Sequence, residues 1–365
     1  MNILELKARN KELNIRETQE GKTVLESRPT RFWFNLTGQC NLQCAHCASN
    51  VYGRVSTQDV DERVYEVVLK EIMPYAYECL LGGTNYGEAL LSKSLKRFFG
   101  DCKNNLVRIA LTTNGTVIND DIISDLVEIS NEISFSMEGM REEYEKIRHF
   151  KWERFLNNVK RVVAAKRLYN KNNLKLKFKF TAHADNITQL PELIEFSKEI
   201  GINSIQVMLM MAYVKEQKNK TLYYNRALAN NYFTIAQRKA EELKIEVTLP
   251  PRFYEGSFEK SPKVTQEVRN NPCSLPWNIM SVNELGVIKP CCVYYVAAGD
   301  LKKTPFLKIW NGKIFQKLRK TVNTKPDKIC FSCKNREKVD FEVKSRWRGY
   351  TEKILERIDN MRLKK

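Results

Sequence analysis

The fold of this chain can be inferred outward from one segment, Arg31-Phe-Trp-Phe-Asn-Leu-Thr-Gly-Gln-Cys-Asn-Leu-Gln-Cys-Ala-His-Cys-Ala-Ser49. Its aromatic and apolar start predicts a strand, and the glycine that follows predicts a loop. Three residues separate Cys40 from Cys44, and two separate Cys44 from Cys47. Thiolates this close together on one loop suit an iron–sulfur cluster or a zinc ion.

The two metals differ in how many ligands they need. A structural zinc site requires four protein ligands, and His46 is the nearby fourth donor. That histidine lies between two of the thiols and would struggle to turn inward together with both. A cubane cluster has four irons, so three thiolates leave one iron open to a small molecule. The spacing therefore favours a reactive cubane over structural zinc.

The Cys-x3-Cys-x2-Cys pattern after a first strand, with an aromatic residue before the last cysteine, resembles the radical S-adenosylmethionine (SAM) superfamily. In that superfamily the open iron chelates SAM, and one electron cleaves SAM to methionine and a 5′-deoxyadenosyl radical. The radical then takes a hydrogen atom from the substrate. The resemblance implies SAM, a [4Fe–4S] cluster on Cys40, Cys44 and Cys47, and an external reductant of the flavodoxin or ferredoxin type.

Length and composition set broader limits. The 365 residues predict two domains, or one large domain with an appendage. Ten cysteines without a signal peptide or a long apolar segment predict a cytoplasmic protein with no membrane span. The net charge of +18 favours anionic partners. Because the basic residues are spread along the chain and form no recognised nucleic-acid module, we do not expect a nucleic-acid partner.

Strand and helix patterns alternate from residue 31 to about residue 211, which predicts a parallel sheet. Six repeats are two short of a complete (β/α)8 barrel. The resemblance implies an α/β fold, a partial (β/α)6 TIM-like barrel. The predicted strands are Phe32–Leu36, Glu78–Leu81, Val107–Thr112, Glu132–Met137, Leu174–Thr181 and Ser204–Met210. The predicted helices are Asp59–Met73, Ser94–Phe99, Asp120–Ile129, Trp152–Tyr169, Gln189–Glu199 and Asn219–Leu243.

Four segments are expected along the chain. Pro250-Pro251 and the polar stretch after them mark the main boundary. The segments are a lead-in at 1–30 that packs on the first strand, the barrel at 31–250, a hairpin-and-helix cysteine domain at 273–340, and a C-terminal helix at 341–365.

Further candidate residues lie at predicted strand ends, where barrels carry their chemistry. Gly83 lets the backbone approach a ligand closely, and the Glu88 carboxylate can accept a hydrogen bond from an ammonium group. The segment resembles the superfamily's Gly-Gly-Glu segment, which binds the SAM amino group, although here Thr84 follows the glycines. An ordinary glycine-rich turn is the alternative.

The next two strand ends also resemble SAM-binding segments of the superfamily. Asn114 belongs to a Thr-Asn-Gly sequence, for which a simple turn is the alternative. Ser136 is a candidate contact to the ribose or carboxylate of SAM. Glu138 is a candidate contact to SAM or substrate, with a turn residue as its alternative. His183, past the fifth strand, is a further candidate, with a packing role as its alternative.

The fifth strand alternates apolar residues with lysines over residues 174–181. Side chains alternate between the two faces of a strand. If the apolar face packs against the helices, the opposite face, with Lys175, Lys177 and Lys179, points into the barrel. Buried ammonium groups need anions, either the SAM carboxylate, a carboxylate side chain or an anionic substrate. We therefore take Lys179 as a candidate catalytic residue, and a solvated edge strand is the alternative.

A second cysteine set begins at Cys273. Two short strands, Asn278–Val282 and Val287–Pro290, predict a hairpin that brings Cys273 and Cys291 to the same end. Cys330-x-x-Cys333 supplies two more thiols after a predicted helix, Pro305–Val322. Four thiolates in this arrangement suit zinc or a cubane.

The spacing of this second set resembles the C-terminal SPASM domains of radical SAM enzymes. Because no cysteine follows Cys333, the match is to the shortened "twitch" form with one auxiliary [4Fe–4S] cluster. The pattern is similar to that of the 2-deoxy-scyllo-inosamine dehydrogenases, which oxidise a sugar alcohol to a ketone. The ligands implied by this resemblance are Cys273, Cys291, Cys330 and Cys333.

A fully ligated second cluster implies outer-sphere electron transfer, and hence two-electron oxidation of a sugar-like alcohol or a peptide. The first alternative is a redox-neutral epimerase in which Cys292 donates a hydrogen atom. The second alternative is a metal-binding module that interacts with nucleic acid. The expected substrate is a small molecule or a peptide, and the net charge of +18 favours an anionic one.

Overall fold

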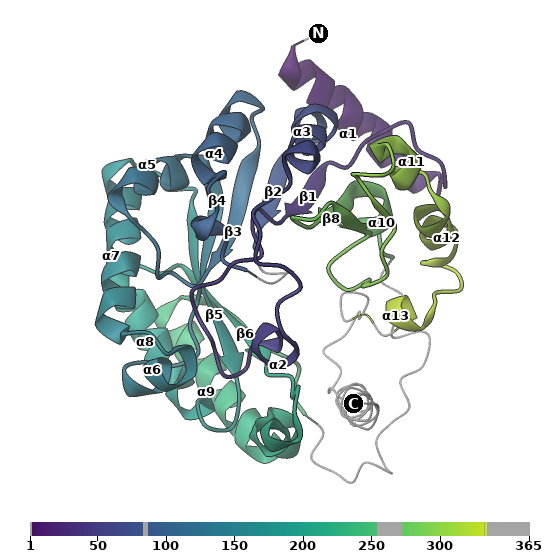
Figure 1. The fold of residues 1–365 in the computed structure, drawn as a ribbon. Helices are drawn as coiled ribbons and strands as arrows, with labels where there is room; N and C mark the ends of the chain where they lie inside the picture. Colours follow the sequence, from purple (N-terminus) through teal and green to yellow (C-terminus); the bar gives the residue numbers. More distant parts are fainter. Residues whose placement is uncertain (1, 83–86, 254–271, 332, 334–365) are drawn as a thin grey trace.

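The computed structural model describes residues 2–82, 87–253, 272–331 and 333. Ten strands form one sheet in the order β10-β9-β8-β1-β2-β3-β4-β5-β6-β7. Figure 1 shows α4, α5, α7 and α8 along the outer side of this sheet. The strands are β1 Arg31–Phe34, β2 Glu78–Leu81, β3 Arg108–Thr113, β4 Ser130–Ser136, β5 Lys175–Ala182, β6 Ser204–Leu209, β7 Glu246–Thr248, β8 Ile279–Val282, β9 Val287–Lys289 and β10 Gly299–Asp300.

Strands β1 to β7 lie side by side in chain order, and all their pairings are parallel. The predicted parallel partial barrel is therefore confirmed. The helices are α1 Ile3–Gln19, α2 Ala48–Tyr52, α3 Glu62–Glu71, α4 Leu95–Asn104, α5 Asp120–Ile129, α6 Glu142–Arg148, α7 Trp152–Leu168, α8 Leu190–Ile200, α9 Arg226–Leu243, α10 Leu275–Asn278, α11 Phe306–Trp310, α12 Lys313–Thr321 and α13 Lys328–Phe331.

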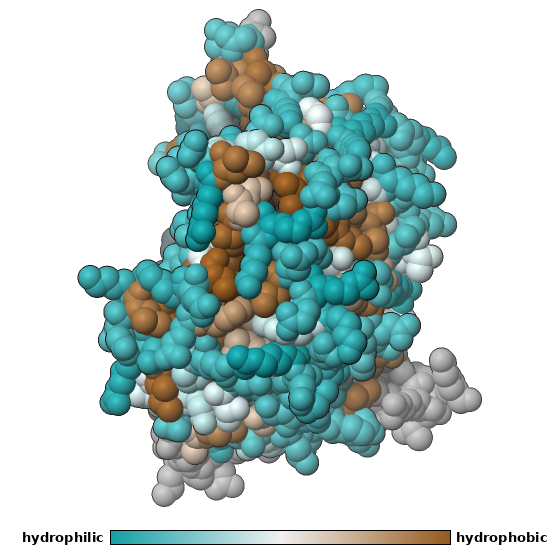
Figure 2. All heavy atoms as spheres, turned by 90° about the vertical axis from the view of Figure 1, so that its left-hand side faces the viewer, coloured by the Kyte–Doolittle hydropathy of each residue, from teal (hydrophilic) through white to brown (hydrophobic). Residues whose placement is uncertain are grey.

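The two faces of the sheet differ sharply. The outer face packs against the helices through fully buried side chains such as Phe34, Phe135 and Phe178. The inner face carries half-buried polar residues, including Thr112 and Lys179. The side of the molecule on which α5 and α7 lie in Figure 1 has a mainly hydrophilic surface with patches of apolar side chains (Figure 2). No helix among the described residues has the length and apolar composition that a bilayer crossing requires.

The C-terminal segment extends the same sheet. Strand β8 pairs in parallel with β1, and β9 returns antiparallel to β8. The predicted hairpin is therefore confirmed. The main chain also bonds just beyond the strands, where Asn35 N donates to Val282 O at 3.0 Å. The cysteine-bearing C-terminal segment is thus fixed to the first barrel strand by backbone hydrogen bonds.

Helix α1 is joined to the rest of the molecule by a buried polar face. Its buried residues are Lys7, Asn10, Asn14 and Glu17. Asn14 Nδ2 donates to Trp277 O at 2.6 Å, and the Glu17 carboxylate accepts the backbone amides of residues 26 and 27 at 2.9 and 3.1 Å. Lys7 Nζ donates to Met73 O at 3.1 Å. The polar sequence of residues 1–30 did not predict this helix, because the face it buries is not apolar.

One predicted helix, Pro305–Val322, is wrong as a single unit. The chain forms α11 and α12 with a break at Asn311 and Gly312. The Asn311 side chain pairs with the backbone of Leu25, donating at 2.8 Å and accepting at 2.9 Å. Arg319 on α12 donates to Pro276 O at 3.0 Å. The N-terminal segment therefore determines where this helix breaks. The predicted helix at 341–365 lies outside the described residues.

Replacement of Glu17 by alanine should destabilise the protein by about 2–3 kcal/mol, because the buried amide of Ser27 and the part-buried amide of Glu26 lose their acceptor. The measurement is urea unfolding followed by circular dichroism at neutral pH. Glu12→Ala, on an exposed position of the same helix, should change stability by less than about 0.5 kcal/mol. Equal effects of the two substitutions would contradict the buried polar face.

Candidate active site

The cysteine loop follows β1 and is tied down by side chains from several parts of the chain. Arg54 donates to Cys40 O at 2.6 Å and to Leu42 O at 3.0 Å. Asn50 Nδ2 donates to Cys44 O at 2.8 Å, and Gln217 Nε2 donates to Ala45 O at 2.9 Å. These bonds satisfy the loop carbonyls and hold the three thiols on a defined backbone.

Two of the thiols receive N–H donors. Asn114 Nδ2 lies 3.9 Å from Cys40 Sγ, and Arg148 Nη1 lies 3.4 Å from Cys44 Sγ. Burial raises the pKa of Cys40 and raises the pKa of Cys44 to about 11. The thiols would have to lose their protons when a metal binds. The N–H groups of Asn114 and Arg148 would then stabilise the thiolates.

Glu88 lies beside this loop because of a close backbone approach at Gly87. Gly87 has φ of +122°, and a Cβ there would lie 2.3 Å from Thr37 O, so only glycine fits. The buried Glu88 carboxylate accepts Thr113 Oγ1 and Asn114 N, each at 2.7 Å. Burial raises the pKa of Glu88 despite these bonds. The predicted Gly83 lies outside the described residues.

Glu138 lies at the end of β4 and forms a buried ion pair with Arg148 of α6. Arg148 Nη2 lies 2.6 Å from Glu138 Oε1, and its Nε contacts the other oxygen. His46 Nε2 lies 3.7 Å from Glu138 Oε1. Burial by itself would lower the pKa of Arg148. The negative charge of Glu138 raises this pKa by more, so the net shift is upward. The sequence did not single out Arg148, because it lies 104 residues from Cys44 in a charged helix typical of a solvated face.

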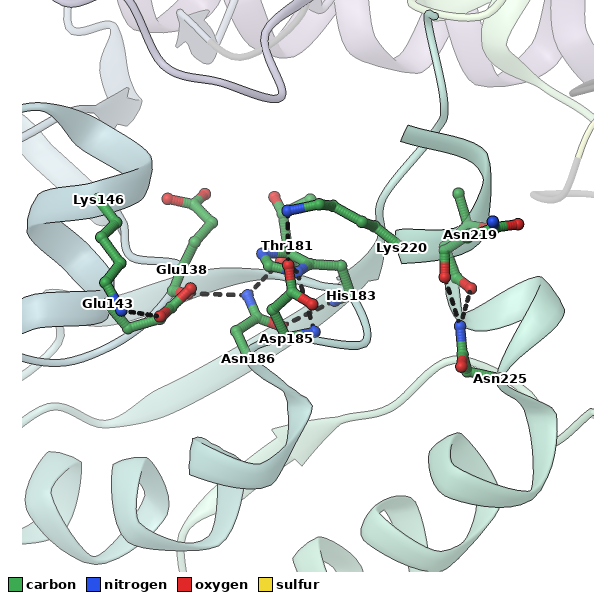
Figure 3. A network of polar contacts seen from close by, with 11 residues as sticks. Glu138, Glu143, Lys146, Thr181, His183, Asp185, Asn186, Asn219, Lys220 and Asn225 are labelled. Atoms are coloured by element: carbon green, nitrogen blue, oxygen red, sulfur yellow. Dashed lines mark hydrogen bonds and ion pairs between the residues drawn. The ribbon is translucent and has the colours of Figure 1, made fainter. Parts of the chain in front are cut away.

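His183 belongs to a polar network at the end of β5 (Figure 3). Asn186 Nδ2 bridges two strand ends by donating to Glu138 O at 2.8 Å and Thr181 O at 3.0 Å. His183 Nδ1 accepts Asp185 N at 3.3 Å, and Asp185 pairs with Lys220 at 2.8 Å. Burial lowers the pKa of His183 to about 4, so the ring is neutral near pH 7.

The alternation predicted for the fifth strand is confirmed. Leu176, Phe178 and Phe180 are fully buried, while Lys177 and Lys179 are half-buried on the inner face. Lys179 stands opposite Ser136 in the β4–β5 register. The structure thus brings the candidates Ser136 and Lys179 together on one face.

The surroundings of the loop fit a bound group. His46 Nδ1 and Ser49 Oγ are buried and have no hydrogen-bond partner among the described residues. Within that same part of the chain, no three His, Cys, Asp or Glu side chains are grouped closely enough to form a metal site as they stand. The fit therefore rests on three thiols from one loop, the N–H donors aimed at two of them and these unpaired polar atoms.

The second cysteine set surrounds a single cavity. Cys273, Cys291, Cys330 and Cys333 all line it, together with apolar side chains such as Leu318. Burial raises the pKa of both Cys291 and Cys330 to about 12. Four thiols around one apolar cavity form a donor set that fits a fully ligated cluster or zinc. Cys292 is exposed and is not among the lining residues.

Hydrogen bonds connect the segments that carry these thiols. Asp327 accepts Tyr294 Oη at 2.8 Å and Cys330 N at 2.9 Å, which links the loop after β9 to α13. Tyr294 N donates to Cys291 Sγ at 3.3 Å. Asn323 pairs with the backbone of Cys273 at 2.7 and 3.2 Å. The cavity is therefore held by side chains other than its thiols.

Comparison with known families matches both halves of the chain. The model for the radical SAM superfamily matches residues 34–174, and that for the SPASM iron–sulfur cluster-binding domain matches residues 273–334. The chain therefore contains a radical SAM domain and a SPASM domain. The predicted cofactors, SAM and iron–sulfur clusters, are confirmed at the level of these two domains.

The radical SAM chain is similar to several characterised proteins. It is 22% identical to the AdoMet-dependent heme synthase of Methanosarcina barkeri, over 86% of this chain and 93% of that protein. It is also 22% identical to the PqqA peptide cyclase of Gluconobacter oxydans, over 86% and 85%. Over 26% of this chain and 38% of the relative, it is 26% identical to the SAM-dependent 2-deoxy-scyllo-inosamine dehydrogenase of Niallia circulans.

Among solved structures, Streptococcus suis SuiB bound to SAM shares the fold. The TM-score is 0.61 at 16% identity, over 89% of this chain and 75% of that one. SuiB has also been solved with its precursor peptide SuiA, at a TM-score of 0.58. This chain therefore shares its fold with SuiB.

Asp327→Ala should lower the iron bound after anaerobic reconstitution from about eight to about four atoms per chain. The physical reason is that the segments carrying Cys291 and Cys330 would lose their shared acceptor, so ordering them would cost more entropy. Iron is measured colorimetrically, and absorbance spectra follow the clusters.

Thr324→Ala is the matched control, because Thr324 is exposed on the same segment and its side chain donates only to Lys320 O in the described structure. It should retain the full iron content. An Asp327→Ala protein with wild-type iron would show that Asp327 is dispensable for the cavity.

Proposed function

We propose that this radical SAM enzyme carries out a two-electron oxidation. The reaction is either the oxidation of an alcohol to a ketone on a sugar-like substrate or the oxidative modification of a peptide. When bound, SAM and the reduced cluster supply a 5′-deoxyadenosyl radical that removes a hydrogen atom from the substrate. Cys40, Cys44 and Cys47 would hold that cluster. A cluster on Cys273, Cys291, Cys330 and Cys333 would supply an electron acceptor.

The polar residues at the strand ends have separable roles in this proposal. Glu88 already accepts three N–H or O–H groups, yet a carboxylate offers about four acceptor sites, so one remains for the SAM ammonium. Asn114 and Ser136 would add hydrogen bonds to SAM. Both carboxylate oxygens of Glu138 are bound by Arg148, which supports a positioning role for Glu138.

The observation that carries the proposal is the cavity whose lining includes the four thiols together with mostly apolar side chains. Four protein ligands leave no open iron on a cubane, so a cluster there would exchange electrons without binding substrate. An electron acceptor in the same molecule as the radical site suits net oxidation.

Cys292 supports the second candidate function, a redox-neutral epimerisation. It is exposed beside the four-thiol cavity without lining it. A thiol in that position would be free to return a hydrogen atom to a substrate radical. The two candidates differ in whether solvent hydrogen enters the product.

The test begins with anaerobic reconstitution and a chemical reductant. The wild-type protein should bind about eight irons per chain and release 5′-deoxyadenosine from SAM. Replacement of Cys40, Cys44 and Cys47 by alanine should abolish the release, whereas Cys102→Ala, outside both cysteine sets, should not. If the wild-type protein releases no 5′-deoxyadenosine, the proposal fails.

The reaction type is tested in deuterium oxide with product analysis by mass spectrometry. Oxidation predicts a product two hydrogens lighter with no carbon-bound deuterium. Epimerisation predicts one deuterium at unchanged oxidation level, and loss of this deuterium in Cys292→Ala. The second result would replace oxidation by the alternative.

A further inference from the structure

The inner face of the sheet holds two lysines in neighbouring positions, and only one of them is neutralised. Lys177 Nζ lies 2.7 Å from Glu132 Oε2, and Ser134 Oγ donates to the other carboxylate oxygen at 2.9 Å. These side chains are mostly buried, with 18% of Lys177 and 26% of Glu132 exposed. Glu132 is therefore committed to Lys177.

The hydrogen bond that Lys179 forms among the described residues goes to a neutral group, and the Glu132 carboxylate acts on it only electrostatically. Its Nζ donates to Thr112 Oγ1 at 2.7 Å, and no described carboxylate oxygen lies within ion-pair distance of it. An ammonium group has three N–H donors, so donors remain after the bond to Thr112. Burial lowers the pKa of Lys179, and a bound anion would offset this cost of burying a charge.

The position of the ammonium group separates it from the cysteine loop. Thr112 precedes Asn114 by two residues, and it is Asn114 that contacts Cys40 Sγ. Lys179 stands opposite Ser136, and Thr112 stands opposite Ser134. The ammonium group therefore reaches back by one inward-facing row, which is about 6–7 Å along a strand. A group bound to Lys179 would thus lie beneath the layer of the cysteine loop.

We propose that Lys179 binds a carboxylate group of the substrate on the inner face of β3 to β5. This inference rests on the proposed function, because it assigns a substrate class, carboxylate-bearing molecules, to the same barrel. SAM also carries a carboxylate. The greater depth of Lys179 favours the substrate as the source, and the experiment below separates the two.

The test measures how fast individual lysines are acetylated by the neutral reagent N-hydroxysuccinimidyl acetate, using peptide mass spectrometry on the anaerobically reconstituted protein. The probes are glutarate, its neutral counterpart glutaramide, and SAM. Glutarate should slow acetylation of Lys179 by about tenfold at saturation, which corresponds to about 1.4 kcal/mol, and glutaramide should not. Lys175, exposed on the same face of the same strand, is the internal control.

Three results would overturn the proposal. Glutarate could fail to protect Lys179, or glutaramide could protect it equally, and either result excludes a carboxylate site. If SAM alone gives the same protection as glutarate, the carboxylate is that of SAM and the substrate assignment is wrong. None of these readouts requires SAM cleavage, so they are distinguishable from failure of the proposed function.

If Lys179 proves too buried to react, thermal unfolding gives the second measurement. Glutarate should raise the melting temperature of the wild-type and Lys175→Met proteins relative to glutaramide. Lys179→Met should abolish this difference, and Lys179→Arg should retain part of it. An identical glutarate effect in Lys179→Met and Lys175→Met would refute the site.

Discussion

The buried carboxylate of Glu17 is the interaction on which the arrangement of the two halves depends. It binds the backbone just before β1, while Asn14 of the same helix binds the backbone just before β8. Helix α1 thus fixes the starts of two neighbouring strands by hydrogen bonds. A polar interface of this kind is favourable only when every buried group has a partner, which makes it specific to one geometry.

The same requirement shapes the site at the other ends of the strands. Carbonyls of the cysteine loop are satisfied by Arg54, Asn50 and Gln217, so the loop does not need metal to account for its backbone polar groups. The buried pair of Glu138 and Arg148 then supplies a fixed charge next to Cys44. In a low-dielectric setting such a pair keeps its geometry, because separation of the charges would be costly.

Sequence patterns predicted most of the barrel and part of the site, for physical reasons that differ by residue. The fifth strand was predictable because its lysines and apolar residues alternate with the period of a strand, and α5 because it has a clean apolar stripe. Helix α1 and Arg148 were missed, since each buries polar groups whose partners are distant in sequence. The break between α11 and α12 depends on Leu25, which no local pattern reveals.

The parallel pairing of β8 with β1 has a consequence for electron movement. The strand that leads into the first cysteine loop and the hairpin that leads into the four-thiol cavity are neighbours in one continuous ladder of backbone bonds. The rate of electron tunnelling falls exponentially with the distance between two redox centres. If a flexible linker joined the centres, thermal motion would change that distance and therefore the rate. Clusters bound to the two cysteine sets would both be attached to this one ladder, so the sheet would set the distance between them.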